Sequence, residues 1–273
     1  MKRFNLLTAA LALLAVVSCN KADGDTPEDV SISSQVKSYS WKAFQNGDVG
    51  NGPEVIPHAG TDYIFTYNPD GKVASLETVY YVSKFDASGK WGLQETSRVT
   101  STYTWNGNVC KVSENGKETV TMTFEGGLLV KEESTASGSA RTTTFRYDGS
   151  RLVGYTVQQE SGATEYEYVW ENGDVSEIKV GTQTYKYAYS SDPNPFAGTF
   201  DVAFDNFGVG YSFLAYGFTG SRNAHKMTGC TPDNHSQPDV YTYTLNSKGQ
   251  VTKIRRGTPE SGFYQDVDIK YYD

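Results

Sequence analysis

The chain has 273 residues, enough for one large β domain or two small ones, and its formal net charge is −8. An acidic chain without a Lys/Arg cluster does not attract nucleic acid or an anionic membrane surface, so both are excluded as partners of the folded part. Hydrophobic residues make up 37%, and the 20 Tyr, 13 Phe and 4 Trp among them each bury a large area.

The N-terminus has the features of an exported lipoprotein. Lys2 and Arg3 precede a 12-residue apolar run, residues 6–17, which is too short to span a bilayer. The Val-Val-Ser-Cys sequence ending at Cys19 resembles a bacterial lipobox. We therefore expect a signal peptide over residues 1–18 and a lipidated Cys19 that anchors the chain to a membrane. The alternative is an ordinary signal peptide that contains a cysteine.

The next segment links this anchor to a folded domain. Residues 19–35 are polar and acidic and contain a proline, which predicts a flexible tether. We expect a single antiparallel β domain over residues 36–273. Its first strand is predicted from Val36 to Phe44, and the glycine- and proline-rich residues 46–60 are predicted to form a loop.

A repeated pattern fills residues 100–189. Each copy has two aromatic or large apolar residues two apart, then a glycine turn, then Val or Leu, often with a second apolar residue three positions later. The copies are Tyr103-Thr-Trp105 with Asn106-Gly107, Met122-Thr-Phe124 with Gly126-Gly127, Phe145-Arg-Tyr147 with Asp148-Gly149 and Tyr168-Val-Trp170 with Asn172-Gly173, with outlying copies at Phe65-Thr-Tyr67 and Tyr241-Thr-Tyr243.

The spacing within each copy predicts a β-hairpin. Alternation with a period of two puts Tyr103 and Trp105 on one face of a strand and Thr102 and Thr104 on the other. Asn-Gly, Asp-Gly and Gly-Gly supply the positive φ that tight hairpin turns need. The step of three after the turn, as from Val109 to Val112, breaks the alternation and predicts a β-bulge or a strong local twist.

Residues 190–239 depart from this pattern. The two prolines that follow Asp192 are expected to end the sheet. Residues 206–220 are aromatic and glycine-rich, and we expect them to plug one end of the sheet, while residues 221–237 are predicted to be a polar loop. Two segments then resume strand periodicity: a hairpin over residues 240–256 and a closing strand over residues 263–272.

The predicted fold is therefore all-β: an up-and-down antiparallel meander of hairpins curled into a barrel or partial barrel, with an irregular plug or loop insertion near residues 190–239. The aromatic pairs with turn glycines resemble degenerate YD repeats of Rhs-type proteins. Together with the lipobox and the Asn194-Pro195-Phe196 break, the chain resembles an uncharacterised lipoprotein family of Bacteroidetes with a porin-like fold. The resemblance spans roughly residues 63–272 and implies a barrel, without catalytic residues.

A membrane-spanning barrel is the alternative architecture. We favour a barrel that does not span, because a lipid anchor would be redundant and because one face is rich in Tyr and Trp while the other carries Arg, Glu and Thr. Hydroxyl and indole groups facing hydrocarbon would be costly. The expected location is the cell envelope, anchored by lipid, on either face of the outer membrane.

Candidate ligand groups are few. His225, Cys230 and His235 are evenly spaced, but the spacing matches no structural zinc signature, so they are weak metal candidates. Cys110 and Cys230 leave two alternatives open, a disulfide or two separate thiols, of which one would be buried and one exposed. No cofactor is expected.

Carboxylate pairs are the second class of candidate. Glu132-Glu133 and Glu165/Glu167 could serve a glycosidase only if two acids face each other across a cleft. Acids on strands whose other face is aromatic are more often solvent-exposed charges. The sequence has no nucleophile elbow, P-loop or dinucleotide fingerprint.

Exposed aromatic rings are the third class. Most Tyr and Trp are expected in the core, but Trp91 beside a turn and Tyr216 in the irregular stretch are candidates for stacking on a ligand. The leading hypothesis is thus a non-catalytic envelope protein that binds or scaffolds a glycan or an extracellular protein. Two alternatives stay open: a hydrolase of envelope glycan that uses acids of residues 190–239, and a purely structural lipoprotein.

Overall fold

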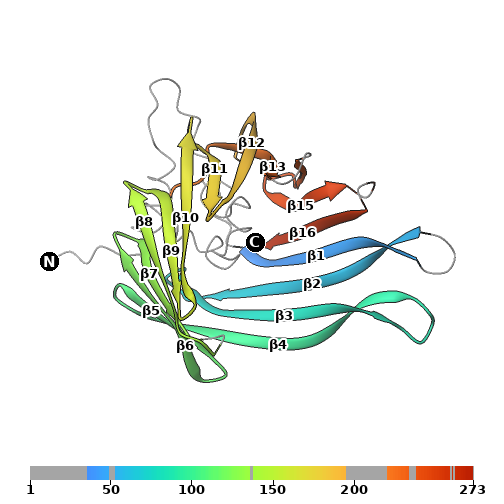
Figure 1. Ribbon diagram of the computed structural model, residues 1–273. Coiled ribbons are helices and arrows are strands. Elements are labelled where there is room, and N and C mark those ends of the chain that lie inside the picture. Colours follow the sequence, from blue (N-terminus) through green and yellow to red (C-terminus); the bar gives the residue numbers. More distant parts are fainter. Residues whose placement is uncertain are drawn as a thin grey trace.

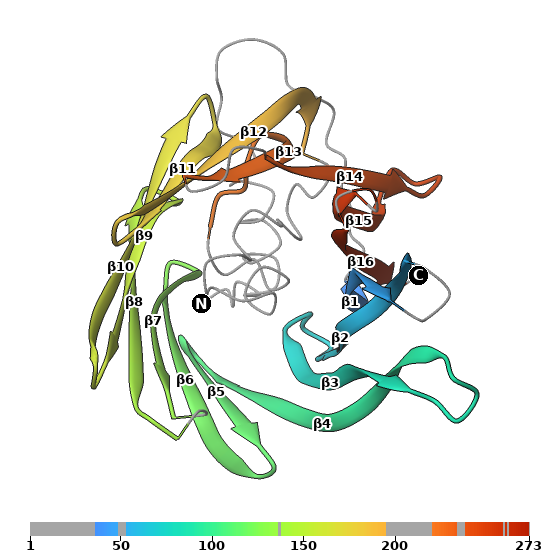
Figure 2. The same cartoon turned by 45° about the vertical axis from the view of Figure 1, so that its right-hand side comes forward.

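The computed structural model describes residues 36–48, 53–135, 138–194, 220–233, 238–258, 260 and 262–272. These residues form one closed barrel of sixteen antiparallel strands (Figures 1 and 2). No helix in this described part of the chain has the length and apolar character needed to cross a membrane. The strands are β1 Val36–Asp48, β2 Pro53–Tyr67, β3 Val73–Phe85, β4 Trp91–Asn106, β5 Val109–Glu114, β6 Lys117–Glu125, β7 Leu128–Ser134, β8 Arg141–Asp148, β9 Arg151–Gln159, β10 Gly162–Glu171, β11 Asp174–Val180, β12 Gln183–Pro193, β13 His225–Pro232, β14 Asp239–Leu245, β15 Val251–Thr258 and β16 Phe263–Tyr271.

Each strand pairs with its neighbours in the sequence, and β1 pairs with β16 to close the ring. The closing ladder runs from Val36 opposite Tyr271 to Gln45 opposite Phe263. The predicted meander of hairpins is therefore confirmed, and the barrel is complete rather than partial. Strands β1 to β4 are long and continue beyond the body of the barrel as an extended sheet (Figure 1).

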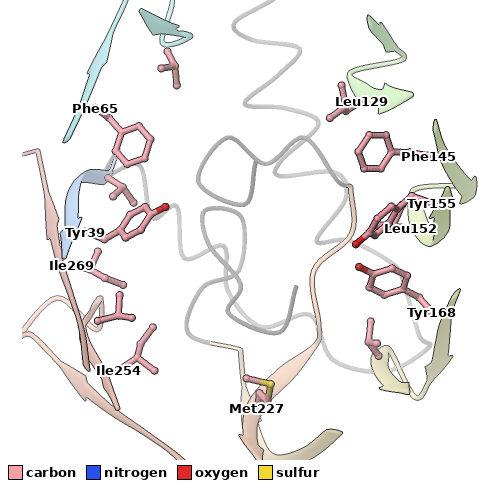
Figure 3. Close-up of a cluster of buried hydrophobic side chains, with 14 of the residues drawn as sticks. Tyr39, Phe65, Leu129, Phe145, Leu152, Tyr155, Tyr168, Met227, Ile254 and Ile269 are labelled. Carbon is pink, nitrogen blue, oxygen red and sulfur yellow. The ribbon is translucent and has the colours of Figure 1, made fainter. Parts of the chain in front are cut away.

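The two faces of the wall differ in chemistry. Large apolar side chains point inward from opposite walls, as Tyr39, Phe65, Phe145 and Tyr168 do in Figure 3, and all four are at most 7% exposed. On the outer face of the wall, β3 to β7 and the β15–β16 pair carry charged side chains that form ion pairs. These join Arg98 to Glu77 and Glu95, Lys111 to Glu118, Lys131 to Glu133, and Arg255 and Lys253 to Asp266.

The predicted bulge is present in seven of the eight odd-numbered strands. In each, the register shifts by one residue near the start of the strand, opposite the end of the neighbouring even strand. Two residues three apart are thereby both turned inward and buried, because the bulge absorbs the extra position. These pairs are Val36 and Tyr39, Val73 and Leu76, Leu129 and Glu132, Leu152 and Tyr155, Val175 and Ile178, Met227 and Cys230, and Val251 and Ile254.

The same seven strands share a hydrogen bond that explains why the repeat ends in Tyr or Trp. An aromatic N–H or O–H on each even strand donates to the main-chain carbonyl that precedes the bulge on the odd strand before it. Main-chain pairing between those two strands stops just short of that carbonyl, so the side chain replaces a ladder bond. We call these seven donors the aromatic collar. They are Tyr67 to Val36, Trp105 to Val73, Tyr147 to Leu129, Trp170 to Leu152, Tyr189 to Val175, Tyr243 to Met227 and Tyr271 to Val251, at 2.7–3.0 Å.

The exception is β5, where the expected bulge between Val109 and Val112 is absent. Cys110 and Val112 face inward in plain alternation, so that prediction was wrong. Here the main-chain ladder continues, and Phe124 N–H donates to the Asn108 carbonyl at 2.8 Å. Phe124 occupies the collar position but carries no donor, which fits a site where the backbone bonds are already made.

Two predicted loops are in fact strands. Residues 46–60 belong largely to β1 and β2. The strand tolerates Pro57 because this residue sits at a register shift, opposite Phe44. Gly60 fits in a crowded place, where a Cβ would lie 3.1 Å from Leu93 Cδ1. The predicted polar loop is also wrong for β13: Met227 and Cys230 are buried inward, and Thr228 between them is the extra residue at the bulge.

A short stretch before β13 lies along the turns at the collar end. Ser221 N–H donates to the Ser150 carbonyl at 2.7 Å, and Ala224 N–H donates to the Gly173 carbonyl at 3.0 Å. β12 ends at Pro193, opposite His225, as the prolines predicted. The expected plug over residues 206–219 lies outside the described residues.

Candidate functional site

The tip of the β3–β4 hairpin carries an exposed aromatic pair. Phe85 and Trp91 face each other at the ends of the two strands, with ring centroids 5.2 Å apart and planes at 71°. Phe85 is 57% exposed and Trp91 is 38% exposed, although each ring covers part of the other. The sequence-based choice of Trp91 as an exposed ring is therefore consistent with the structure. Phe85 was missed; its place directly across the five-residue turn from Trp91 was the available signal.

The turn between these rings is held rigidly. The Asp86 carboxylate accepts hydrogen bonds from Ser88 Oγ and from the backbone N–H groups of Ser88 and Lys90, at 2.7–3.0 Å. The hydrogen bond from the Ser88 hydroxyl, followed by that from Lys90, holds the pKa of Asp86 below its usual value. A fixed turn presents the two rings without an ordering cost at the moment of binding.

The inner wall contains an acid at a position that is apolar in the other six bulged strands. Glu132 is 2% exposed, and Arg141 Nη2 donates to its Oε1 at 2.6 Å. Burial raises the pKa of Glu132, and the hydrogen bond from Arg141 opposes that rise. Glu132 was a candidate acid in the sequence, but its place in the inner wall was not predicted. Applying the three-residue step from Leu129, as in the other repeats, would have placed Glu132 inside.

A second ion pair lies on the inner face at the start of β14. Arg256 Nη2 and Nε donate to Asp239 Oδ2 at 2.6 and 3.0 Å. The β13–β14 ladder places Cys230 opposite Asp239, and the β12–β13 ladder places Tyr187 opposite Cys230. Both inner ion pairs are closed contacts between neighbouring strands, so each carboxylate already has a cationic partner.

The three weak metal candidates are not assembled by the described residues. The His225 ring faces Asp174, with Nδ1 2.7 Å from Oδ2, and its backbone N–H donates to the same carboxylate. Cys230 is buried in the inner wall, and His235 lies outside the described residues. Across the described ranges, no group of three or more His, Cys, Asp or Glu is placed to hold a metal ion.

Both described cysteines are free thiols. Cys110 and Cys230 are each buried, on β5 and β13. The disulfide alternative is therefore wrong, and so is the expectation that one thiol is exposed. Burial raises the pKa of the Cys110 thiol to about 12 and that of Cys230 to about 11, so both are protonated and unreactive at neutral pH.

The carboxylate pairs from the sequence do not form a catalytic pair. Glu132 points inward to Arg141, whereas Glu133 points outward to Lys131 at 2.8 Å. Glu165 and Glu167 are both exposed on the outer face of β10. Adjacent residues on opposite faces of a strand cannot flank one glycosidic bond.

A shallow depression of about 220 Å³ lies on the outer wall, lined by Thr242, Thr244, Lys253 and Arg255. Its two cations resemble an anion site. Both of them already bind the buried Asp266, whose pKa is lowered by hydrogen bonds from Arg255 and Lys253 that outweigh the effect of its burial. Lys253 also lies 3.8 Å from Asp268, so two carboxylates balance the two cations. The depression is therefore a neutralised part of the wall rather than a site for an anionic ligand.

Two of the predicted site residues have no described position. Cys19, the expected lipidation site, and Tyr216, the second candidate for ligand stacking, both lie outside the described residues. Among the residues that are described, the candidate site with exposed binding groups is the hairpin tip. This tip joins β3 and β4 at the end of the extended sheet, away from the body of the barrel (Figure 2).

The chain is similar to one protein family and to two solved structures. A family model described as "domain of unknown function (DUF4595) with porin-like fold" matches residues 62–253. A porin-like protein from Bacteroides uniformis superposes with a TM-score of 0.64 at 17% identity, covering 87% of this chain and 98% of that one. A porin-like protein from Bacteroides vulgatus gives a TM-score of 0.49 at 12% identity, covering 88% and 99%. No curated protein matches the chain.

Proposed function

We propose that this chain, which belongs to the porin-like DUF4595 family of unknown function, is a lipid-anchored envelope protein that binds a ligand without catalysis. The observation that supports this most is the exposed Phe85–Trp91 pair, which lies beside a hydrogen-bonded turn, whereas inner rings such as Phe65 are buried. Exposed aromatic faces on rigid elements are typical of binding sites. The anchor and the tether would hold the barrel at the membrane surface.

The polarity of the wall supports a barrel that does not use its strands to cross the membrane. A spanning barrel turns an apolar band about 25 Å tall outward and a polar lining inward. In the described strands the arrangement is the reverse: Tyr39, Phe65 and Tyr168 face in, and ion pairs such as Lys111–Glu118 face out. Charged outer positions are costly in hydrocarbon, so water is the solvent that suits this wall.

A glycan or an extracellular protein is the ligand class that this tip fits. A Trp face stacks on a sugar ring, and a pair of edge-on aromatic rings is also a common anchor in protein interfaces. The described acids give no support to the alternative of a glycan hydrolase. Asp192 binds Lys226, Asp239 binds Arg256, and Asp233 accepts from the Thr184 backbone N–H.

The test is a glycan and cell-wall array probed with the chain lacking residues 1–19, which lie outside the described barrel. We expect binding that is lost in Trp91→Ala and retained in Tyr272→Ala, a matched exposed aromatic at the C-terminal end. No binding to glycan or cell wall at millimolar ligand would refute the glycan-binding role. Unchanged membrane fractionation of Cys19→Ala would refute the lipid anchor.

A further inference from the structure

The part of β4 that extends beyond the barrel has an open edge. β4 pairs with β3 from Trp91 to Thr102, but its ladder with β5 begins at Ser101. Residues 91–100 are therefore paired on one side, and no other strand of the described chain pairs with them. Residues 94–98 are all exposed. Figure 1 shows this edge running free along the lower side of the extended sheet.

An open edge presents a row of unpaired N–H and C=O groups to another chain. Natural proteins protect such edges with proline, lysine or a covering element. Residues 91–100 contain neither proline nor lysine. The protection that is present consists of a bulge at Thr96, where the register with β3 shifts between Tyr80 and Tyr81, and of two opposite charges, Glu95 and Arg98.

We propose that this edge pairs antiparallel with the same edge of a second copy of the chain, forming a two-fold symmetric dimer. The face of each residue restricts the register. Because of the bulge, Leu93, Glu95, Arg98 and Thr100 share the outer face, whereas Gln94 and Val99 share the other. Paired residues in an antiparallel ladder must lie on the same face, so every residue before the bulge must meet a same-face residue after it.

Charge then selects one register among those that match faces. With Glu95 opposite the partner copy's Arg98, the two-fold symmetry repeats the contact, so both charges on each copy meet an opposite charge. The same register places Gln94 opposite Val99 and Leu93 opposite Thr100. Shifting by two residues puts Arg98 opposite Leu93 or Glu95 opposite Thr100, which leaves both charges without a cross-strand counterpart.

This self-complementarity is what favours a second copy over an unrelated peptide. An isologous interface requires one patch to match itself under a two-fold rotation, and the Glu95–Arg98 pair does so. Within one copy Arg98 binds Glu95 and Glu77 at the surface. Such exposed contacts exchange at little cost, so the same guanidinium can bind the partner copy's carboxylate. The dimer does not depend on what the Phe85–Trp91 tip binds.

A charge-swap series measured by analytical ultracentrifugation of the full chain tests the proposal. We expect a dimer for the unmodified chain, and a dissociation constant raised at least about tenfold by Arg98→Glu, which sets like charges opposite each other twice. The double variant Glu95→Arg/Arg98→Glu should return to within about threefold of the unmodified chain.

Lys111→Glu is the control, because it disrupts an exposed ion pair on the barrel wall away from this edge. It should leave the dimer unchanged, and an unchanged unfolding midpoint for Arg98→Glu shows that the variant is folded. A monomer at about 100 μM, too weak for a specific interface, would overturn the proposal. A dimer that Arg98→Glu does not weaken would overturn it equally, since the register then cannot be the one described.

Discussion

Removing one hydroxyl from the aromatic collar tests why the repeat carries Tyr or Trp at its end. In Tyr147→Phe the ring stays and the O–H that donates to the Leu129 carbonyl at 2.8 Å is lost. Leu129 is fully buried, so water does not readily replace the donor. A buried acceptor left unpaired costs about 1–3 kcal/mol. We expect the free energy of unfolding to fall by about that amount.

The assay is equilibrium unfolding in urea, followed by circular dichroism. Tyr80→Phe is the control, because Tyr80 is 44% exposed and outside the collar, and surface changes of this kind stay within about 0.5 kcal/mol. Phe124→Tyr is the converse test. The backbone there already bonds to Asn108, so the added hydroxyl should not stabilise. Equal losses in Tyr147→Phe and Tyr80→Phe would refute the proposed role of the collar.

Three further predictions follow from single residues. Gly220→Ala should lower the free energy of unfolding by more than about 3 kcal/mol, because φ is +83° and a Cβ would lie 2.1 Å from the Ser150 carbonyl oxygen. Gly107→Ala is the control: its φ is also positive but the space is open, so it should cost about 1–2 kcal/mol in the same unfolding assay. Equal losses in the two variants would contradict the steric cause. Because burial raises the pKa of Glu132, its protonated form stabilises the barrel below the unfolded pKa and that contribution is lost as pH rises through the folded pKa. Glu132→Gln should therefore flatten the fall in unfolding free energy above about pH 4.5, whereas Glu133→Gln, on the exposed outer face, should not. Identical pH profiles of unfolding free energy for the two variants would exclude Glu132 as the group responsible. Burial also raises the pKa of Tyr271 to about 12 and that of Tyr67 and Tyr147 further. The neutral phenols stabilise fully below about pH 10 and lose that contribution as pH rises through the folded values, so unfolding free energy should decline from pH 10 upward, and a flat profile to pH 12 would contradict the burial of these rings.

The repeat made most of the barrel predictable from the sequence. Alternating aromatic residues and turn glycines gave the strands between residues 100 and 189, and the step of three gave the bulges. Both signals are local, because they depend on side-chain period and turn geometry. What the pattern could not reveal was β5, where the backbone ladder continues and the step of three is a coincidence of sequence.

The missed strands have a different cause. β13 presents Met227 and Cys230 to the interior among polar residues, so its apolar signal is weak. β2 begins with prolines and carries Gly60, residues that indicate a loop unless the neighbouring strand is known. In both cases contacts with neighbouring strands determine that the segment is a strand: Tyr187 lies opposite Cys230, and Leu93 lies close to Gly60. Such long-range pairing has no local signature.

The candidate site was predictable in part. Trp91 stands beside a turn glycine, which indicates exposure, and the structure shows it exposed. The open edge of β4 could not be foreseen, because it follows from the difference in length between β4, with 16 residues, and β5, with 6. That difference appears only once the strand ends are aligned.

The central claim is that the wall faces water and its aromatic face is closed inward. Cysteine substitutions along β4, in the full chain on membranes, test this with a water-soluble maleimide. We predict labelling at Thr100, Thr102 and Thr104, which are exposed outward, and protection at Ser101, Tyr103 and Trp105. Protection of the threonine positions by lipid, or labelling of the aromatic positions, would contradict the account.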